Sequence, residues 1–217
     1  MAGAPGGPLI LSEVKLADLA MRRVNVLFVT GRRDLQVLRT LCDAISPARI
    51  GAFFASGNPN VTDAARIAGF TCLDFEGVKR QVFKRRKQRP VFVLDYSGDL
   101  WWHALMAEAR FWNVSTVTMV CNALCHPFVR DNADLCFILP TRKALLMSTR
   151  LLAELSRLVP VEAKKLVEQA LNHRALIGVD LRAERRVFFS PMFGTSLPWQ
   201  RSTAALADVD LDAKADE

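Results

Sequence analysis

Seven basic side chains lie between positions 79 and 89, and no carboxylate separates them. Repulsion within such a run is uncompensated unless an anion is bound, which favours contact with nucleic-acid phosphates over a solvated helix face. Two guanidiniums also follow Thr30 and Gly31, where free N–H groups at a helix start suit phosphate. A further basic pair follows Pro140. The predicted phosphate contacts are Arg32, Arg33, Lys79, Arg80, Lys84, Arg85, Arg86, Lys87, Arg89, Arg142 and Lys143.

Carboxylates and histidines are present, but their spacing does not match a known catalytic pattern. Asp95 and Asp99 follow an apolar run, yet they are four positions apart where the haloacid-dehalogenase pattern needs two. Turn and helix-cap chemistry explains both more simply. None of the three histidines has an evident Ser, Cys or Asp partner. We therefore expect no catalytic residue, no cofactor and no small-molecule substrate.

The cysteines allow a metal site to be drawn but do not favour one. Cys121, Cys125 and His126, with Cys136 further on, lack the spacing of a zinc knuckle or ribbon. Buried thiols fit their apolar surroundings better. Five cysteines are an odd number, which indicates reduced thiols in an intracellular compartment rather than a disulfide framework. We predict no metal.

Composition agrees with a polyanionic partner. The net charge of +7 and the pI of about 9.5 favour one, and 51% hydrophobic residues suffice for a buried core. No apolar run is long enough to cross a bilayer, so we expect no membrane contact. The first positive side chain is Lys15, and no targeting signal is visible before it.

Apolar runs alternate with helical periodicity along most of the chain. Strands are expected at 24–30, 50–54, 71–75, 91–95, 117–120 and 135–139. Helices are expected between the first five strands, a loop at 122–132 before the last, and two more helices after Pro140. Parallel strands need crossover helices, so this alternation predicts a doubly wound parallel sheet, a flavodoxin-like three-layer α/β/α fold. A short helix is expected at 9–21, ahead of the domain.

Three segments follow from this pattern: a leading segment at 1–21, an α/β domain at 22–176 and an irregular C-terminal extension at 177–217. The periodicity is lost from Gly178 onward, while aromatic residues continue. Exposed aromatics in an irregular segment need a partner surface. The predicted partner contacts are Phe188, Phe189, Phe193 and Trp199.

Six motifs in register resemble the ribosomal protein S-two family of the small ribosomal subunit. They run from VLFVTGRR at 26–33 through VTD at 61–63, RPVFVLD at 89–95, NVSTV at 113–117 and CHP at 125–127 to DLCFILP at 134–140. The resemblance covers roughly 24–158. The family's N-terminal Phe-Gly-His region is missing, and its long helical hairpin is reduced to the basic stretch at 79–89.

The resemblance implies a structural constituent of a small ribosomal subunit that binds ribosomal RNA and neighbouring ribosomal proteins. Its divergence favours a mitochondrial ribosome. Two alternatives stay open. One is a flavodoxin-like enzyme that binds a nucleotide or phosphorylated metabolite at the carboxyl ends of the strands, with Thr30, Gly31, Asp95, Ser97 and Asn122 as candidates. The other is a protein scaffold without RNA contact.

Overall fold

The structure is a computed structural model. It describes residues 12–13, 25–30, 34–45, 52–85, 90–96, 100–109, 111–112, 114–120, 127–182 and 187–191. Within these ranges the strands form one nine-stranded sheet. The strands are β1 (Ser12–Glu13), β2 (Asn25–Thr30), β3 (Ala52–Ala55), β4 (Thr71–Cys72), β5 (Val91–Asp95), β6 (Ser115–Val120), β7 (Leu135–Leu139), β8 (Ala175–Asp180) and β9 (Val187–Pro191).

The sheet has the order β1-β9-β8-β7-β2-β6-β5-β3-β4. The six strands from β7 to β4 are all parallel, and β8 is antiparallel to both of its neighbours. The predicted doubly wound α/β fold is confirmed. The order of the parallel strands in the sheet differs from their order in the sequence, because the first long strand, β2, lies between β7 and β6.

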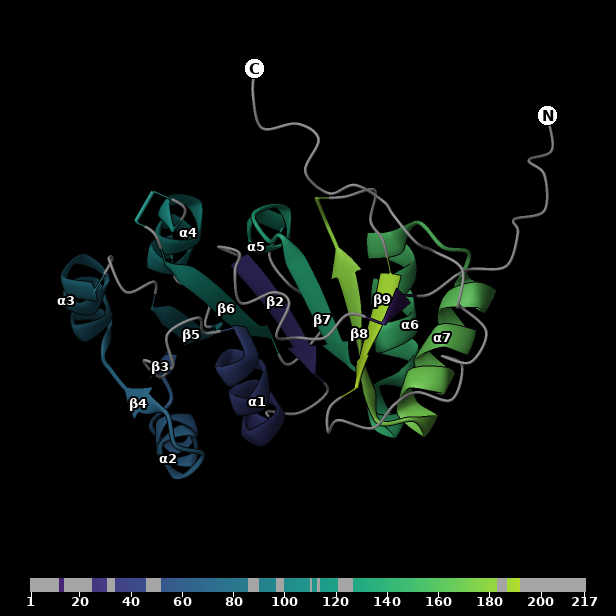
Figure 1. The fold of residues 1–217 in the computed structure, drawn as a ribbon, viewed down its shortest axis with the longest axis horizontal. Helices are drawn as coiled ribbons and strands as arrows, with labels where there is room; N and C mark the ends of the chain where they lie inside the picture. The colour runs from purple at the N-terminus through teal and green to yellow at the C-terminus, as the bar shows by residue number, and fades with distance from the viewer. Residues whose placement is uncertain are drawn as a thin grey trace, which may run out of the picture.

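Helices cover both faces of this sheet (Figure 1). The helices are α1 (Leu35–Ile45), α2 (Pro59–Ile67), α3 (Phe75–Arg85), α4 (Leu100–Glu108), α5 (Pro127–Asp131), α6 (Leu145–Ser156) and α7 (Pro160–Asn172). Buried side chains of α1 and α2 share one core cluster with Val26 and Val93. Buried side chains of α3 to α7 pack on the other face, against alternate residues such as Leu27 and Leu94. The alternation follows from the two-residue period of a strand.

Local signals in the sequence explain where several helices begin. Asp34 caps α1, since its Oδ1 accepts from the Val37 N–H at 3.2 Å. Asn58 caps α2 in the same way through the Asn60 N–H at 3.0 Å, and Pro59 takes the first helical position. Thr141 caps a short 3-10 turn, η3 (Arg142–Ala144), that leads into α6.

The C-terminal boundary at 177 was wrong. β8 crosses it, and β9 completes the described part of the sheet. The boundary was placed too early because Gly178 suggested the end of the domain. In the structure this glycine makes room for an aromatic ring. A Cβ at this position would lie 2.2 Å from ring carbons of Phe188 on the paired strand. The glycine therefore marks close packing inside a strand.

Two smaller expectations also differ from the structure. The predicted helix at 9–21 contains β1, whose two residues pair with Phe188 and Phe189 of β9; the other residues of that helix lie outside the described ranges. The predicted loop at 122–132 contains α5. Only five residues long, α5 gives no periodic pattern that could be recognised in the sequence.

Candidate functional site

Four parallel strands end side by side at the carboxyl edge of the sheet. After β2 and β3 the chain passes to α1 and α2 on one face, whereas after β5 and β6 it passes to α4 and α5 on the other. The neighbouring pairs β2/β6 and β3/β5 therefore separate at two topological switch points. Ligands of open α/β sheets bind in the crevices outside such points.

A buried carboxylate lies at the β3/β5 switch point. Asp95 is the last residue of β5 and is 5% exposed. The Ser56 hydroxyl, directly after β3, donates to Asp95 Oδ2 at 2.8 Å and accepts from the Asn58 N–H at 3.0 Å. This chain of hydrogen bonds holds the carboxylate in one orientation. A carboxylate held in this way can accept a hydrogen bond from a ligand hydroxyl.

Thr30 lies at the same edge and on the same face as Asp95. It is the last residue of β2 and is fully buried. Phe28, two residues earlier, and Asp95 both stand level with Met119 of β6. Side chains two apart share a face, so Thr30 and Asp95 both face the α1/α2 side. Two of the five residues predicted for nucleotide binding thus lie on the same face of the sheet, on strands that β6 separates. Gly31, Ser97 and Asn122 lie outside the described ranges.

The helix starts at this edge are occupied by the chain's own side chains. Asp34 provides a carboxylate at the start of α1, and Asn58 provides an amide at the start of α2. The backbone of α1 therefore already binds an anionic group. Phosphate contact near Thr30 then depends on Arg32 and Arg33, which the described ranges do not include.

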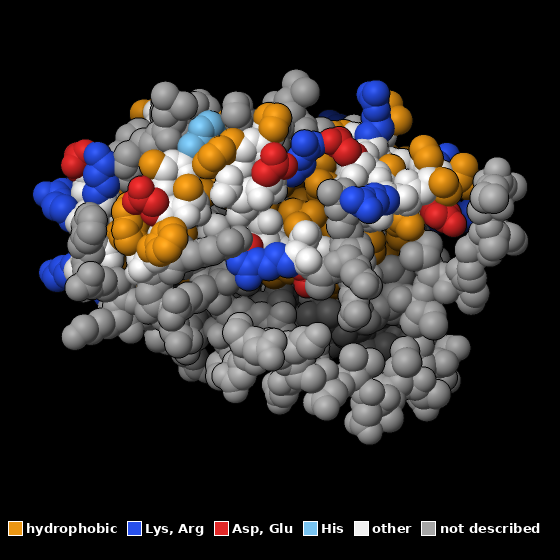
Figure 2. Space-filling model, turned by 90° about the horizontal axis from the view of Figure 1, so that it is seen from above, with side chains coloured by type: hydrophobic (Ala, Val, Ile, Leu, Met, Phe, Trp, Pro, Cys, Tyr) orange, Lys and Arg blue, Asp and Glu red, His pale blue; other side chains and the backbone are white. Residues whose placement is uncertain are grey.

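The basic residues predicted to bind phosphate fall on separate parts of the molecule. Arg80 and Lys84 are exposed one turn apart on α3. Lys79 pairs with Glu76 at 2.7 Å, and the Arg85 guanidinium lies 5.5 Å from the centre of the Phe53 ring. Figure 2 shows Lys and Arg side chains gathered at the end of the molecule where α3 lies. Arg86, Lys87 and Arg89 are outside the described ranges.

Arg142 and Lys143 do not join this group. Both are exposed on η3, which follows β7. Four strand spacings separate β7 from β3, on which α3 packs, a distance of about 19 Å. The two basic sets therefore form separate surfaces.

The predicted partner contacts of Phe188 and Phe189 were wrong. Both belong to β9 and are buried, 4% and 1% exposed, on opposite faces of the sheet. Phe188 packs edge-on against Phe137, with ring centres 5.8 Å apart. The two side chains were expected to be exposed because the segment that contains them shows no strand pattern that could be recognised in the sequence. Phe193 and Trp199 lie outside the described ranges.

The cysteines within the structure behave as core residues. Cys42 and Cys136 are fully buried free thiols, as the sequence predicted for Cys136. Burial, reinforced by the neighbouring Asp43 carboxylate, raises the pKa of the Cys42 thiol far above its ordinary value. Among the described residues no group of three His, Cys, Asp or Glu side chains could hold a metal. Cys121, Cys125 and His126 are not among them.

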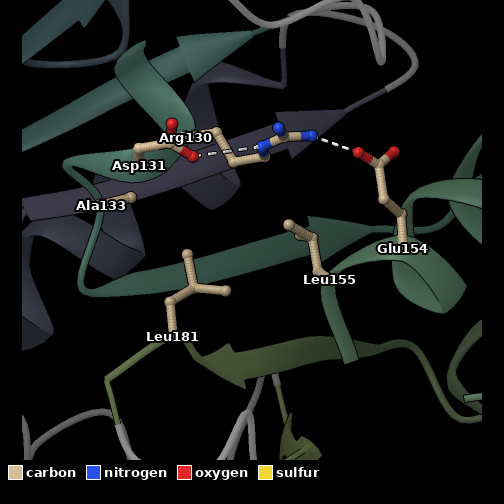
Figure 3. Close-up of a pocket in the computed structure, with 6 residues that line it drawn as sticks. All are labelled: Arg130, Asp131, Ala133, Glu154, Leu155 and Leu181. Atoms are coloured by element: carbon tan, nitrogen blue, oxygen red, sulfur yellow. Dashed lines mark hydrogen bonds and ion pairs between the residues drawn. The ribbon is translucent and has the colours of Figure 1, made fainter. Parts of the chain in front are cut away.

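A cavity of about 300 Å³ lies at the opposite, amino edge of the sheet. Figure 3 shows Arg130 of α5 reaching across it to Glu154 of α6, above an apolar wall that includes Leu155 and Leu181. Arg130 also pairs with Asp131, at 3.6 Å. Its charge is therefore already compensated, and we assign the pair to holding α5 against α6.

The sequence gave no sign of a row of aromatic rings formed by Tyr96, His103 and Phe128. Tyr96, directly after Asp95, lies parallel to His103 of α4 with ring centres 6.3 Å apart. His103 in turn lies 4.9 Å from Phe128 at the start of α5. All three are half-buried. They come from three separate segments, so only the fold brings them together.

Proteins similar to this chain are found among solved structures. No family model matches the chain, and no curated protein does. Among solved structures, the genome packaging NTPase B204 from Sulfolobus turreted icosahedral virus 2 in complex with sulfate has a TM-score of 0.51 at 14% identity. It covers 77% of this chain and 95% of its own. The complex with AMPPCP gives 0.50 at 13%, with 76% and 96% covered.

These comparisons correct two predictions. The main prediction, a structural constituent of a mitochondrial small ribosomal subunit, is contradicted because the similar structures are of an NTPase and not of a ribosomal protein. The prediction that the chain is not an enzyme is contradicted on the same ground. The similarity itself shows that this sheet and its helices share the fold of B204 over about three quarters of the chain.

Proposed function

We propose that this chain binds a nucleotide or a phosphorylated metabolite at the carboxyl edge of its sheet and acts on it as an enzyme. The observation that carries the proposal is the buried Asp95 carboxylate at the β3/β5 switch point, bonded to the half-buried Ser56. Asp95 is 5% exposed, and its carboxylate is held in one orientation by the Ser56 hydroxyl at 2.8 Å. The edge where it lies is the place at which α/β sheets bind ligands.

In this proposal the site has two parts. Asp95 accepts a hydrogen bond from a ligand hydroxyl, with Ser56 holding the carboxylate in place. Gly31, Arg32 and Arg33, which follow Thr30 in the sequence, would receive the phosphates. The similar B204 structures are complexes with AMPPCP, ATP-gammaS and AMP, which supports a nucleotide as ligand.

Binding is tested by calorimetry and thermal unfolding with ATP, ADP, AMP and inorganic phosphate. A ligand that binds only the folded state at 100 times its Kd stabilises it by about 2.7 kcal/mol and raises Tm. Asp95→Asn should weaken binding at least about tenfold, equivalent to about 1.4 kcal/mol. The matched control is Asp63→Asn, an exposed carboxylate on α2 that pairs only with Arg66 in the described structure.

Release of phosphate from ATP measures the enzymatic part. We expect turnover by the unmodified chain and its loss in Asp95→Asn, with Asp63→Asn unchanged. If none of the four ligands raises Tm and no phosphate is released, the proposal is wrong.

The α3 surface favours a second candidate function, contact with a nucleic-acid backbone. Arg80 and Lys84 are exposed at i and i+4, where like charges repel unless an anion lies between them. Binding of a labelled oligonucleotide should weaken as salt rises. Replacing both by Ala should reduce the slope of log K against log salt by up to about 2, because each phosphate contact contributes about 0.9.

The matched control is Lys164→Ala with Lys165→Ala, two exposed lysines on α7. That pair should leave the salt slope unchanged. Equal effects of the two double variants would mean that only net charge matters and that α3 is no specific surface.

A further inference from the structure

We infer that Ser56 is a catalytic nucleophile, which takes the γ-phosphoryl group of a bound nucleoside triphosphate and carries it as a phosphoserine until water releases it. This inference rests on the proposed function and deepens it by assigning a reaction to the same site. The juxtaposition behind it is that of a half-buried serine hydroxyl and a buried carboxylate at the ends of two paired strands.

The hydroxyl of Ser56 has the base that a serine nucleophile needs. A serine hydroxyl is a weak nucleophile until an adjacent base accepts its proton, and the two groups must lie within about 2.6–3.2 Å of each other. The Ser56 Oγ donates to Asp95 Oδ2 at 2.8 Å, which is within that range. In protein kinases an aspartate accepts the proton of a substrate hydroxyl during phosphoryl transfer. Asp95 is placed to accept the proton of Ser56 in the same way.

The backbone fixes the direction in which this hydroxyl points. Ser56 directly follows β3, and Asp95 is the last residue of β5, the strand that pairs with β3 in parallel. The Asn58 N–H donates to the Ser56 Oγ at 3.0 Å, so the hydroxyl accepts from Asn58 and donates to Asp95. A hydroxyl has one proton and two lone pairs. Among the described residues nothing else bonds to this oxygen, which leaves its second lone pair for a bond to phosphorus.

The surroundings of Ser56 suit an incoming phosphate group. Ser56 is half-buried, the next two residues are exposed, and a Cβ at Gly57 would meet nothing within 4 Å. The first turn of α2 carries no acidic side chain, and the neutral amide of Asn58 caps it. The partial positive charge at the start of α2 therefore favours negative charge on the neighbouring Ser56.

The proposed ligand contacts leave the γ-phosphorus within reach of Ser56. A ligand hydroxyl and the Ser56 hydroxyl both bond to the Asp95 carboxylate in this proposal. Two hydrogen bonds, the width of the carboxylate and the distance of attack on phosphorus together span roughly 11 Å. That length is enough to reach from a ribose hydroxyl to the γ-phosphorus of an extended triphosphate. One nucleotide can therefore meet both residues.

The reaction consists of two displacements at phosphorus. In the first, Ser56 Oγ bonds to the γ-phosphorus, and the nucleoside diphosphate leaves with the electron pair of the broken P–O bond. The hydroxyl proton passes to Asp95 and from there to solvent. In the second, the oxygen of a water molecule bonds to the phosphorus, the bond to Oγ breaks, and Oγ takes a proton from that water. The products are a nucleoside diphosphate and phosphate, and the only other reactant is water.

Acid quenching within the first turnover of γ-labelled ATP, supplied as its magnesium salt, measures the phosphoserine. We expect up to one labelled phosphate per chain, stable to hydroxylamine and located at position 56 by mass spectrometry. Ser56→Ala should carry no label and should release phosphate at least about 100-fold more slowly, while the Kd of ATP changes far less. Ser56→Thr, which keeps a hydroxyl, should retain the label.

The matched control is Ser156→Ala. Ser156 is also half-buried, and its hydroxyl donates to the Leu152 carbonyl on α6, away from the proposed site. This variant should keep both the label and the rate of phosphate release. Circular dichroism and Tm establish that each variant is folded.

The configuration at phosphorus decides the case in which the phosphoserine decays too fast to be trapped. Two displacements retain the configuration of thiophosphate released from stereospecifically labelled ATP-gammaS, whereas direct attack by water inverts it. Inversion, a label removed by hydroxylamine, or unchanged release by Ser56→Ala would each overturn Ser56 as the nucleophile and leave the proposed function standing. If ATP does not raise Tm and no phosphate is released, both proposals are overturned.

Discussion

Gly178 is a residue whose lack of a side chain is needed by the described structure. The Phe188 ring occupies the space that a Cβ would take, 2.2 Å from it, in the middle of the pairing between β8 and β9. The ring therefore packs directly over the glycine, which leaves space for it because it has no side chain. This pairing of a small residue with an aromatic one fixes which residues of the two strands stand opposite each other.

Gly178→Ala should lower the free energy of unfolding by about 1–3 kcal/mol, because the added methyl group must displace a ring fixed within the core. Urea denaturation measures the change. Gly57→Ala is the control, since a Cβ there meets nothing within 4 Å, and it should change stability little. Combining Gly178→Ala with Phe188→Leu should recover part of the loss. Additive losses in the double variant would contradict the contact.

Burial of the Cys42 thiol makes the free energy of unfolding depend on pH. Burial and Asp43 raise the pKa of this thiol, while Arg39 opposes them more weakly. In the unfolded chain the thiol ionises around its ordinary value of 9.0, whereas in the folded chain it stays protonated. Unfolding therefore releases a proton above that pH, and the stability contributed by this group falls as pH rises.

Cys42→Ala should reduce the loss of stability between pH 9 and pH 10.5, by up to about 1.4 kcal/mol per pH unit. Denaturation curves at several pH values, compared with those of Thr40→Ala on the exposed side of α1, measure it. Equal slopes for the unmodified chain and Cys42→Ala would show that the thiol titrates alike in both states.

At the scale of elements, one buried side chain ties four of them together at the amino edge. The Asn25 amide donates to the carbonyls of Met106 at 3.0 Å and Asn132 at 3.2 Å, and its oxygen accepts from Thr116 at 2.8 Å. The Asn25 N–H donates to Asp134 Oδ2 at 2.7 Å. These bonds join β2 to α4, to the end of α5, to β6 and to the start of β7.

Asn25→Ala should cost about 2–4 kcal/mol of stability, because it leaves buried carbonyls and a hydroxyl without their partner. Asn172→Ala, at the exposed end of α7, is the control and should stay within about 0.5 kcal/mol. Chemical denaturation of both variants decides this. A loss below 1 kcal/mol for Asn25→Ala would mean that water replaces the amide.

At the scale of the whole molecule, β8 and β9 decide where the domain ends. Both core faces contain side chains from these strands, Leu176 and Phe188 on one face and Ile177 and Phe189 on the other. We therefore expect residues up to 191 to unfold with the sheet. Within the described residues, no helix is both long and apolar enough to cross a membrane.

Phe189→Ala should destabilise the entire domain by about 3–5 kcal/mol, in one transition, because it empties a fully packed position. Leu146→Ala, a 73% exposed residue of α6, is the control and should have little effect. Thermal unfolding followed by both near- and far-ultraviolet dichroism provides the measurement. An unchanged Tm for Phe189→Ala would restore the view of 177–217 as an appendage.

The candidate site could be predicted in part. Thr30 and Asp95 were identifiable from the sequence because each ends an apolar run, and parallel strands place such ends at one edge. Ser56 was not identified, although it also ends an apolar run, because its role depends on β3 lying beside β5. The row of Tyr96, His103 and Phe128 could not be found, since one residue follows β5, the others lie in α4 and α5, and the three meet only in space.

The sequence by itself determined the class of fold and the strands of its parallel core, because a strand buried on both faces is a local run of apolar residues. Tertiary structure alone decided the strand order, the switch points and the place of β8 and β9. Those depend on pairings between residues far apart in the sequence, such as Asn25 with Asp134 and Ser12 with Phe188, and no local pattern records them. The proposed function depends on the tertiary structure, because a site at a sheet edge forms only when the strands are arranged in this order.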